Sequence, residues 1–470
     1  MAKGKRLEPL GRPLIRLALV VIVGGVAPLV DTTVVNVALH AISADLQVGT
    51  DAIQWVTTAY LLALAVTVPV TAWACDRFGS KRLWIAGLAL FLAGSGLCAL
   101  AWNFWSLVAF RAVQGAGAGI MLPVLQTILV RAAGPAKTGR LLTIVMLVST
   151  IAPIAGPLVG GAIVNSGSWR WVFVINLPIC VAAILLALTF VPREPAQPGK
   201  RLDLPGVLLL GIGTAALLYA LGNAAADGSD AGVRVWTPLV AGVALTIGFV
   251  AWSLARGTRA AIPVRIFAHK AFSAATATLF LTGVALYGAL FLIPLYFQQQ
   301  REMSALAAGT VLALQGIGSL LTRWVGSVVD RLGARLITVV GVVLCAAATL
   351  PFTIATARTS WVVLGIALIV RGGALSAVNI AITADAFTGL SREQVPAGSA
   401  IVRLVQQLGG AAGTALLATV VTGVSATAGT ATGFHTAFLW SIGLTVAALI
   451  PCAFIPAARP TEPAARTKTG

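Results

Sequence analysis

The sequence predicts an all-α, polytopic membrane protein with fourteen transmembrane helices, arranged as six, two and six. Three observations predict this class: an apolar composition, apolar runs long enough to cross a bilayer, and basic residues concentrated in alternate connecting segments. Of 470 residues, 58% are hydrophobic and 10% are charged, whereas a soluble domain carries about 25% charged residues. Lipid must therefore surround most of the chain, and no room remains for the large soluble catalytic or nucleotide-binding domain that most enzymes need.

The apolar runs set the expected helices, since a transmembrane helix takes about 20 apolar residues. The first run follows a basic start and is too long for the core of a signal peptide, so we expect it to stay as a span. An even number of spans puts both termini on one side. The predicted spans are 16–39, 53–73, 83–101, 105–130, 141–164, 171–191, 204–222, 236–254, 273–297, 306–329, 336–356, 361–384, 397–422 and 435–456.

The distribution of Lys and Arg predicts the orientation. With these spans, 25 of the 32 basic residues fall in or close to the segments on the side of the termini, with Arg16 and Arg403 just inside span ends, and 4 fall on the opposite side. Cytoplasmic loops carry the excess of positive charge, so we expect both termini in the cytoplasm and the chain in the plasma or inner membrane. The net charge of +18 is thus explained by topology and does not indicate nucleic acid.

An internal repeat divides the chain. Asp76–Lys81 (DRFGSK) and Asp330–Arg335 (DRLGAR) share the pattern D-R-x-G-x-[KR], 254 residues apart, while Arg111 and Arg371 lie 260 apart. Two six-span halves with two inserted helices explain both offsets, and such repeats place a substrate site between the halves near the bilayer midplane. The expected parts are 1–191, a six-helix bundle; 192–260, two linker helices; 261–458, a second six-helix bundle; and 459–470, a cytoplasmic tail.

Several motifs, in order along the chain, carry a family resemblance. They are Leu29–Leu39 (LVDTTVVNVAL), the Asp76–Lys81 loop, Arg111–Gly117 (RAVQGAG), Gly156–Gly161 (GPLVGG), and the pair Trp169–Phe173 (WRWVF) and Asn176–Pro178 (NLP). With these motifs the chain resembles the major facilitator superfamily over nearly its whole length, and in particular the fourteen-span drug:proton antiporters. The resemblance implies the major facilitator fold and the exchange of a substrate for protons.

Asp31 is the acidic residue expected deepest in the membrane, about 15 residues or ~22 Å along its helix. A carboxylate at that depth costs ~2.5–3.5 kcal/mol unless it is paired or faces a wet cavity. Binding a proton removes the charge, so we predict that Asp31 couples transport to protons. The alternative is a carboxylate that only bonds neighbouring Thr or Asn groups and holds the first helix in place.

Arg111 is equally costly in the membrane and keeps its charge. The resemblance links the matching arginine to proton transfer, so we predict that Arg111 acts with Asp31 and that Gln114, one turn away, holds it. The alternative is that Arg111 snorkels to water from near the end of its span. Arg371 is similar, but the sequence does not decide its role.

Two further groups take their expected roles from the resemblance. The first is a conformational latch that stabilises one side of the transport cycle, with a plain topology anchor as the alternative: Asp76, Arg77, Gly79, Lys81, Asp330, Arg331 and Gly333. The second is the antiporter motif, which favours an exporter over an importer and whose small residues allow close helix packing: Pro153, Gly156, Pro157, Gly160 and Gly161.

Polar and aromatic residues within the spans are candidates for the substrate cavity, because aromatic faces suit lipophilic cations. These candidates are Asn36, Tyr60, Gln114, Tyr287 and Phe291. The five cysteines stand singly, without metal-ligand spacing, so we expect no metal and no cofactor. The expected partners are a small lipophilic substrate, protons and membrane lipids, with no nucleic acid and with the chain as a monomer.

The sequence therefore predicts a secondary active transporter, not an enzyme, that exports lipophilic drugs or antibiotics in exchange for protons. No nucleotide-binding G-x-x-x-x-G-K-[ST] loop occurs, so the chain does not hydrolyse ATP itself. Two alternatives stay open: proton-coupled uptake of a small metabolite, and a membrane scaffold that transports nothing.

Overall fold

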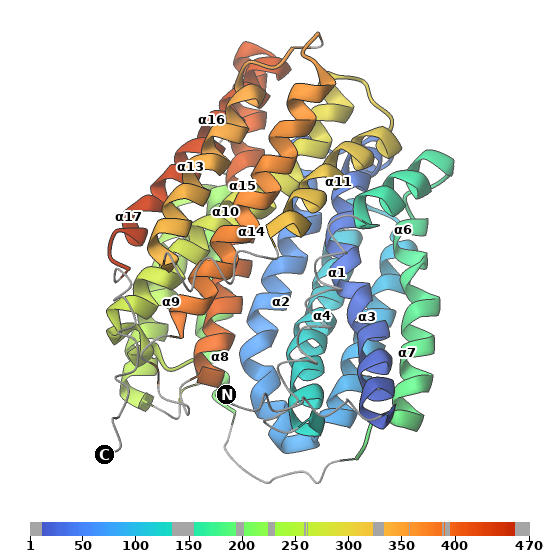
Figure 1. The fold of residues 1–470 in the computed structure, drawn as a ribbon, viewed down its shortest axis with the longest axis vertical. Coiled ribbons are helices and arrows are strands. Elements are labelled where there is room, and N and C mark those ends of the chain that lie inside the picture. Colours follow the sequence, from blue (N-terminus) through green and yellow to red (C-terminus); the bar gives the residue numbers. More distant parts are fainter. Residues whose placement is uncertain are drawn as a thin grey trace, which may run out of the picture.

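The computed structural model describes residues 12–133, 155–193, 202–223, 231–257, 260, 262–322, 333–356, 358–387, 390 and 395–455. Every regular element within these residues is a helix (Figure 1). Eleven of the described helices are long and apolar enough to cross a membrane, and two shorter apolar helices, 52–68 and 305–321, accompany them. The all-helical membrane architecture predicted from composition is confirmed, whereas the count of fourteen spans stays a prediction.

The first half of the chain forms one bundle. Within it, α4 packs against both α3 and α2, and α7 packs against α1. Its elements are α1 (Arg12–Leu46), α2 (Thr50–Phe78), α3 (Ser80–Ala99), α4 (Phe104–Ala133), the helical residues 155–166, α6 (Trp171–Val174) and α7 (Asn176–Phe190).

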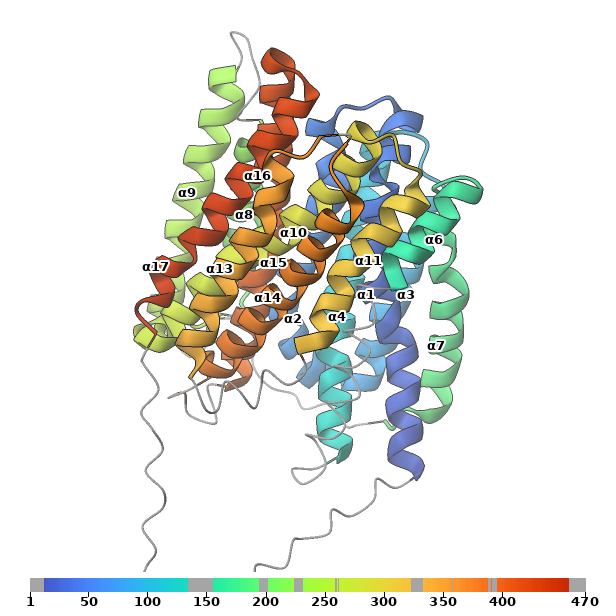
Figure 2. The ribbon, with the colours of Figure 1, turned by 45° about the horizontal axis from the view of Figure 1, so that its top comes forward.

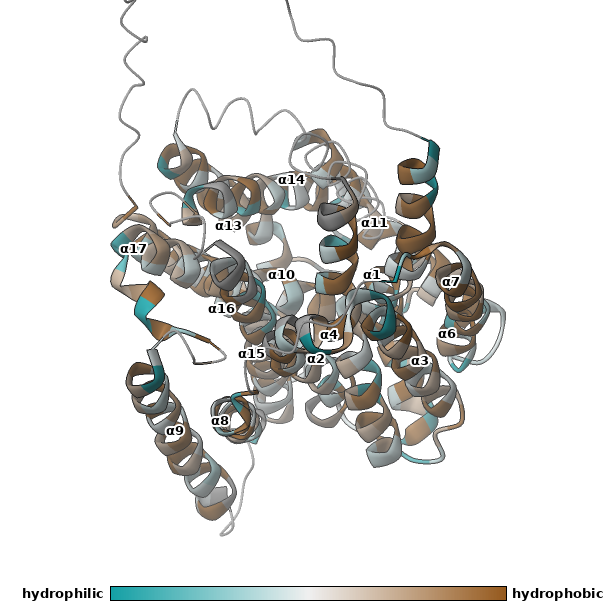
Figure 3. Cartoon of the chain, turned by 90° about the horizontal axis from the view of Figure 1, so that it is seen from below, coloured by the Kyte–Doolittle hydropathy of each residue, from teal (hydrophilic) through white to brown (hydrophobic). Residues whose placement is uncertain are grey.

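Two inserted helices pair with each other at the side of the molecule (Figure 3). They are α8 (Leu204–Gly222) and α9 (Ala231–Arg256), and a short 3-10 helix, η2 (Val264–Ala268), follows them. Asp203 caps α8 by accepting a bond from the backbone N–H of Gly206, and it also accepts a bond of 2.8 Å from the Trp252 indole on α9. Helix α8 packs against α2 and α15, so the inserted pair contacts both halves.

The second half of the chain forms the other bundle. Here α10 packs closely on α15, and α14 packs on both α11 and α13. Its elements are α10 (Lys270–Gln300), α11 (Ala305–Leu321), α13 (Ala334–Thr353), α14 (Trp361–Ala386), α15 (Val395–Ala428), α16 (Thr430–Ala447) and α17 (Leu449–Cys452).

The predicted repeat has a matching turn in each half. Gly79, between α2 and α3, has φ 82° and ψ 148°, and Gly333, before α13, has φ 83° and ψ 151°. A side chain is strained in this region of φ/ψ space, which explains why glycine stands at the fourth position of both D-R-x-G-x-[KR] segments. The same backbone conformation thus recurs 254 residues along the chain.

Large apolar side chains are exposed on the outside of the described helices. The hydropathy colouring in Figure 3 shows that brown, hydrophobic residues make up much of every long helix. Val240 and Ile247 on α9 are each 64% exposed, and Ile212 on α8 is 55% exposed. Such a continuous apolar exterior is incompatible with water but matches the hydrocarbon core of a bilayer.

The two halves pack against each other along α2 and α15, and they also touch at the end of the molecule that lies away from the termini. Figure 2 shows that α1 begins at the lower end and that α16 descends to α17 toward that same end. Near the opposite end, Gln298 on α10 donates a hydrogen bond of 3.1 Å to the Val37 carbonyl on α1. A Cβ on Gly161 would lie 2.5 Å from Leu306 Cα on α11, so the halves touch there backbone to backbone.

Candidate functional site

A buried ion pair forms the centre of the first bundle. Arg111 Nη1 on α4 lies 2.6 Å from Asp31 Oδ2 on α1, and the two side chains are 1% and 0% exposed. The two residues are 80 positions apart in the sequence, and they meet because α1 and α4 pack side by side. The snorkelling alternative for Arg111 is therefore wrong: its guanidinium lies inside the bundle, against a carboxylate.

Amide and hydroxyl groups from two more helices complete the carboxylate's surroundings. Asp31 Oδ1 accepts bonds of 2.9 Å from Gln114 Nε2 and 2.9 Å from Asn176 Nδ2 on α7. The same two amide groups reach Ser95 Oγ on α3, at 2.6 Å and 3.2 Å. Both oxygens of Asp31 are thus hydrogen-bonded, and all the partners come from helices other than its own.

The Arg111 guanidinium is held by three further groups. Its Nε donates to the Val56 carbonyl at 3.0 Å, its Nη1 donates to Gln114 Oε1 at 2.6 Å, and its Cζ lies 4.1 Å from the centre of the Tyr60 ring. Arg111 is a permanent cation, so it stays charged whether or not the carboxylate holds a proton. The arrangement can therefore exist in a neutral paired form or in a positively charged form with a proton on Asp31.

Small residues bring these helices close enough for the network. A Cβ on Gly94 of α3 would lie 2.6 Å from Gln114 Cα, and one on Gly117 of α4 would lie 2.5 Å from the Phe91 backbone N. A larger side chain at either position would separate α3 from α4. The separation would draw Gln114 away from Ser95 and Asp31.

The second bundle holds a corresponding arginine in a different setting. Arg371 on α14 is 1% exposed and donates to Thr349 Oγ1 at 3.2 Å, Gln315 Oε1 at 3.0 Å and the Ala285 carbonyl at 2.8 Å. All three acceptors are neutral, and within the described residues Arg371 has no salt bridge.

Comparison with known proteins decides the family. The family model "Major Facilitator Superfamily" matches residues 21–414. The chain belongs to this superfamily. It is 35% identical over 412 residues to the "Multidrug resistance protein B homolog" of Mycobacterium tuberculosis, covering 87% of this chain and 76% of the relative. It is 28% identical over 417 residues to the "Multidrug export protein EmrB" of Haemophilus influenzae, covering 88% and 81%.

Solved structures agree on the fold. A POT family transporter in complex with a thioalcohol-conjugated peptide superposes with a TM-score of 0.70 at 15% identity, over 94% of this chain and 96% of that one. This superfamily member is therefore a multi-pass membrane transporter of small molecules and not an enzyme. The family resemblance that we drew from the motifs is confirmed.

The predicted cavity residues of this superfamily member divide into groups. Tyr60 and Gln114 belong to the network around Asp31. Asn36 is 1% exposed and lies on α1 about one helix turn beyond Asp31. Its Oδ1 accepts a hydrogen bond of 3.2 Å from Thr57. Phe291 is fully buried in the apolar core that joins the halves, and Tyr287 contacts both bundles.

The predicted latch is only partly described. Gly79 and Gly333 form the matching turns, Arg77 is exposed, and Lys81 Nζ donates 2.8 Å to the Leu188 carbonyl at the end of α7. Asp330, Arg331 and the Asp76 side chain lie outside the described residues. The latch role stays a prediction.

The described part of the antiporter motif packs on both halves. A Cβ on Gly160 would lie 2.8 Å from the Val34 carbonyl of α1, while Gly161 meets α11. Gly156 directly contacts Thr33 of α1, and Pro157 presents its carbonyl to Gly309 of α11. Pro153 lies outside the described residues. These contacts place the motif at the junction of the two bundles, whereas its transport role stays a prediction.

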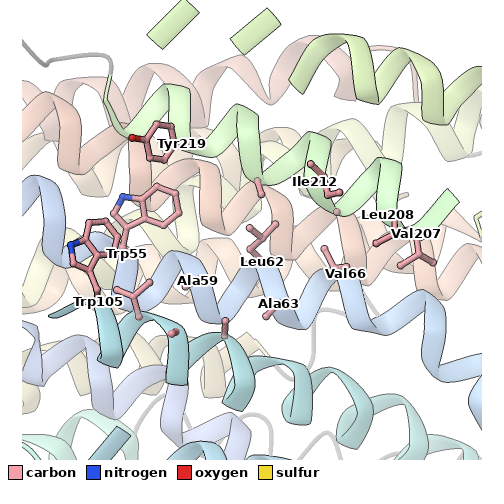
Figure 4. A pocket seen from close by; sticks show the side chains of 15 residues that line it. Trp55, Ala59, Leu62, Ala63, Val66, Trp105, Val207, Leu208, Ile212 and Tyr219 are labelled. Atoms are coloured by element: carbon pink, nitrogen blue, oxygen red, sulfur yellow. The ribbon is translucent and has the colours of Figure 1, made fainter. Parts of the chain in front are cut away.

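A separate apolar groove of about 480 Å³ lies between α2, α4 and the inserted α8 (Figure 4). Trp55, Trp105 and Tyr219 surround one end, and Leu62, Val66 and Ile212 line its length. Its size is that of a small-molecule site, but it faces the lipid side of the helices.

Sequence reasoning missed Ser95 and Asn176. Asn176 stands in the N-L-P motif, where its polarity inside an apolar run was an available signal. Ser95 is an ordinary small residue in α3, and only the packing of α3 on α4 shows its contact with the amides.

Proposed function

We propose that the chain is a fourteen-span secondary transporter that exports lipophilic, drug-like molecules in exchange for protons. The observation that carries the proposal is the Asp31 carboxylate, which is enclosed by three hydrogen-bonding partners in a bundle built for lipid. The names of the multidrug relatives support the export of drug-like substrates. The proposed parts remain 1–191, 192–260, 261–458 and 459–470, with both termini cytoplasmic.

The coupling step is the arrival of a proton at Asp31. In the described state its two oxygens accept from Arg111, Gln114 and Asn176, as an ionised carboxylate does. A proton on Oδ2 would take the place of the bond from Nη1 and leave Arg111 with neutral acceptors. Because a cation without a counter-charge is costly inside a bundle, the helices that hold Arg111 would favour a different arrangement.

The contacts between the halves indicate which side is closed. We propose that the end at which Gly161 meets α11 and Gln298 meets Val37 is the external end, and that the described state is closed there. Proton loading from outside then requires these contacts to separate. The antiporter motif lies at this junction, so it controls the opening by which substrate leaves.

Reconstituted vesicles test the proposal. Purified protein in proteoliposomes should accumulate a lipophilic dye against its gradient when a proton gradient is applied. For one charge, a driving force equivalent to 100 mV is worth ~2.3 kcal/mol, about a 50-fold concentration ratio. Asp31→Asn should reduce that ratio to about one while dye still equilibrates across the membrane.

Two controls sharpen the test. Asp45→Asn removes an acid from the exposed pair with Arg170, whose side chains are 49% and 36% exposed, and should leave coupling intact. Asp31→Asn/Arg111→Gln removes both buried charges together and covers the case in which the single variant fails to fold. Dye movement that ignores the proton gradient in the wild-type protein would contradict the proposal, and dye driven the other way would favour uptake.

A further inference from the structure

Each bundle holds one buried arginine at a corresponding place. Of the two, only the arginine of the first bundle is described with a carboxylate beside it. At the repeat offset of 254, Asp31 corresponds to Ala285 and Ser95 corresponds to Thr349. Arg371 donates to the Ala285 carbonyl and to Thr349 Oγ1, whereas Arg111 bonds Asp31 directly and is linked to Ser95 through Gln114. The second bundle therefore keeps the buried arginine but has Ala285 at the position that corresponds to Asp31.

A second cation lies nearby on α15. Arg403 is partly buried about 12 Å from the first residue of that helix, at 1.5 Å per residue. It forms no hydrogen bond or salt bridge with another described residue, and it lies one helix turn before Gln407, which bonds Tyr287 on α10. Arg371 thus bonds α10 at position 285, and the part of α15 that carries Arg403 and Gln407 bonds it at position 287.

A buried hydrogen-bond acceptor without a partner lies close to Arg403 along α15. Gln407, one turn beyond Arg403, is 8% exposed and donates 3.3 Å to Tyr287 Oη, while its own Oε1 has no hydrogen-bond partner. Gln406 on the same helix donates 2.7 Å to Asn379 Oδ1 on α14. We name Tyr287, Arg403 and Gln407 the Arg403 cluster. The cluster offers the N–H donors of the Arg403 guanidinium and one acceptor without a partner, Gln407 Oε1.

The Arg403 cluster borders the coupling site. Tyr287 packs against the apolar core that joins the halves and against the core of the first half, which includes Tyr60, and the Tyr60 ring carries Arg111. A molecule bound at the cluster would therefore lie between the bundles, beside Asp31 and its network. A substrate site at such a junction is where a two-bundle transporter needs one.

We propose that the Arg403 cluster binds the anionic group of an amphipathic organic acid, with Arg371 adding a second positive charge behind it. The inference rests on the proposed function for the identity of this acid as the transported substrate. A carboxylate or phenolate would satisfy the Arg403 donors, and a neighbouring hydroxyl or N–H on the ligand would satisfy Gln407 Oε1.

The electrostatics favour an anion over a cation at this place. Asp31 is already neutralised by Arg111, and the Tyr60 face already carries that guanidinium at 4.1 Å. Neither is available to a cationic ligand. Two arginines without a described acidic partner would repel a cation, and an anion would lower the cost of keeping them in the bundle.

Equilibrium binding tests this inference separately from transport. Fluorescein and rhodamine 123 share a xanthene ring system but carry opposite net charge, and fluorescence polarisation reports their binding to the purified chain in lipid nanodiscs. Fluorescein should bind more tightly than rhodamine 123. Arg403→Gln should weaken fluorescein binding roughly 10- to 100-fold, the value of a lost charged hydrogen bond, and should not weaken rhodamine 123.

Matched variants separate binding from folding. Arg403→Lys keeps the charge and should restore much of the affinity, whereas Arg358→Gln on the exposed α13–α14 connection should change nothing. Tighter binding of rhodamine 123, no binding of fluorescein, or a fluorescein affinity unaffected by Arg403→Gln would each overturn the inference. If fluorescein binds as expected but no proton gradient drives it, the proposed function fails while the anion site stands.

Discussion

Replacing Asp31 by Asn tests whether the central ion pair is desolvated. Two unit charges 2.6 Å apart attract by about 6 kcal/mol at an effective dielectric constant of ~20, and desolvation offsets part of this. Removing one partner of a buried pair costs about 3–5 kcal/mol. The Asn carbonyl oxygen can still accept from Arg111, so we expect a loss near the low end, about 3 kcal/mol.

The five cysteines supply the assay, because none of them is in a disulfide and all of them are buried. A thiol-reactive fluorophore in detergent micelles therefore reports the unfolding of the bundle as temperature or denaturant increases. The wild-type protein, Asp31→Asn, Arg111→Gln and the double variant form a cycle whose interaction term isolates the pair. The double variant should recover at least half of the loss, since it leaves no unpaired charge inside the bundle.

Asp45→Asn is the matched control for this cycle. Its partner Arg170 lies at a similar distance, 2.9 Å, but both side chains reach water. An exposed pair contributes only about 0.2–1 kcal/mol, so this variant should unfold almost like the wild type. If Asp31→Asn were no more destabilising than Asp45→Asn, the pair would be hydrated and our account of the coupling site would be wrong.

Three more predictions follow from the same contacts. Arg371→Gln should destabilise the protein by about 2 kcal/mol less than Arg111→Gln in the thiol assay, because it leaves no buried carboxylate unpaired; equal losses would contradict this. Asn176→Ala should cost about 1–3 kcal/mol, since it removes one donor from the carboxylate, whereas an unchanged unfolding midpoint would show that this bond contributes little. Gly161→Val should place a side chain against Leu306, hold the halves apart and abolish transport, with faster hydrogen exchange in the first turns of α11; normal exchange there would refute the contact.

Much of the fold was predictable because the bilayer imposes simple rules on a chain. A helix in lipid must be apolar along about 20 residues, and basic residues mark one side, so composition and spacing identified the membrane helices. The D-R-x-G-x-[KR] repeat likewise predicted the glycine turns at Gly79 and Gly333, since few other residues adopt their backbone conformation. The depth of Asp31 followed from its position within one apolar run.

The site itself was less predictable, because its partners come from separate helices. The sequence placed Asp31 at depth and Arg111 near the start of its span, and the resemblance suggested that they act together, but snorkelling remained an alternative for Arg111. Ser95 gave no signal, and the one signal at Asn176 was its polarity inside an apolar run. The absence of a carboxylate beside Arg371 could be seen only when its three neutral acceptors were known.

The sequence by itself determined that this protein lies in a membrane, that it is built from two related halves, and that one acid stands deep within the first. These properties depend on single residues and on local spacing, which hydrophobicity and helix geometry translate directly into structure. Only the tertiary structure decided that Asp31 is paired, that Arg371 and Arg403 have no acidic partner among the described residues, and which helices join the two halves. Charge pairing and helix contact depend on distances between residues far apart in the chain, and packing alone sets those distances.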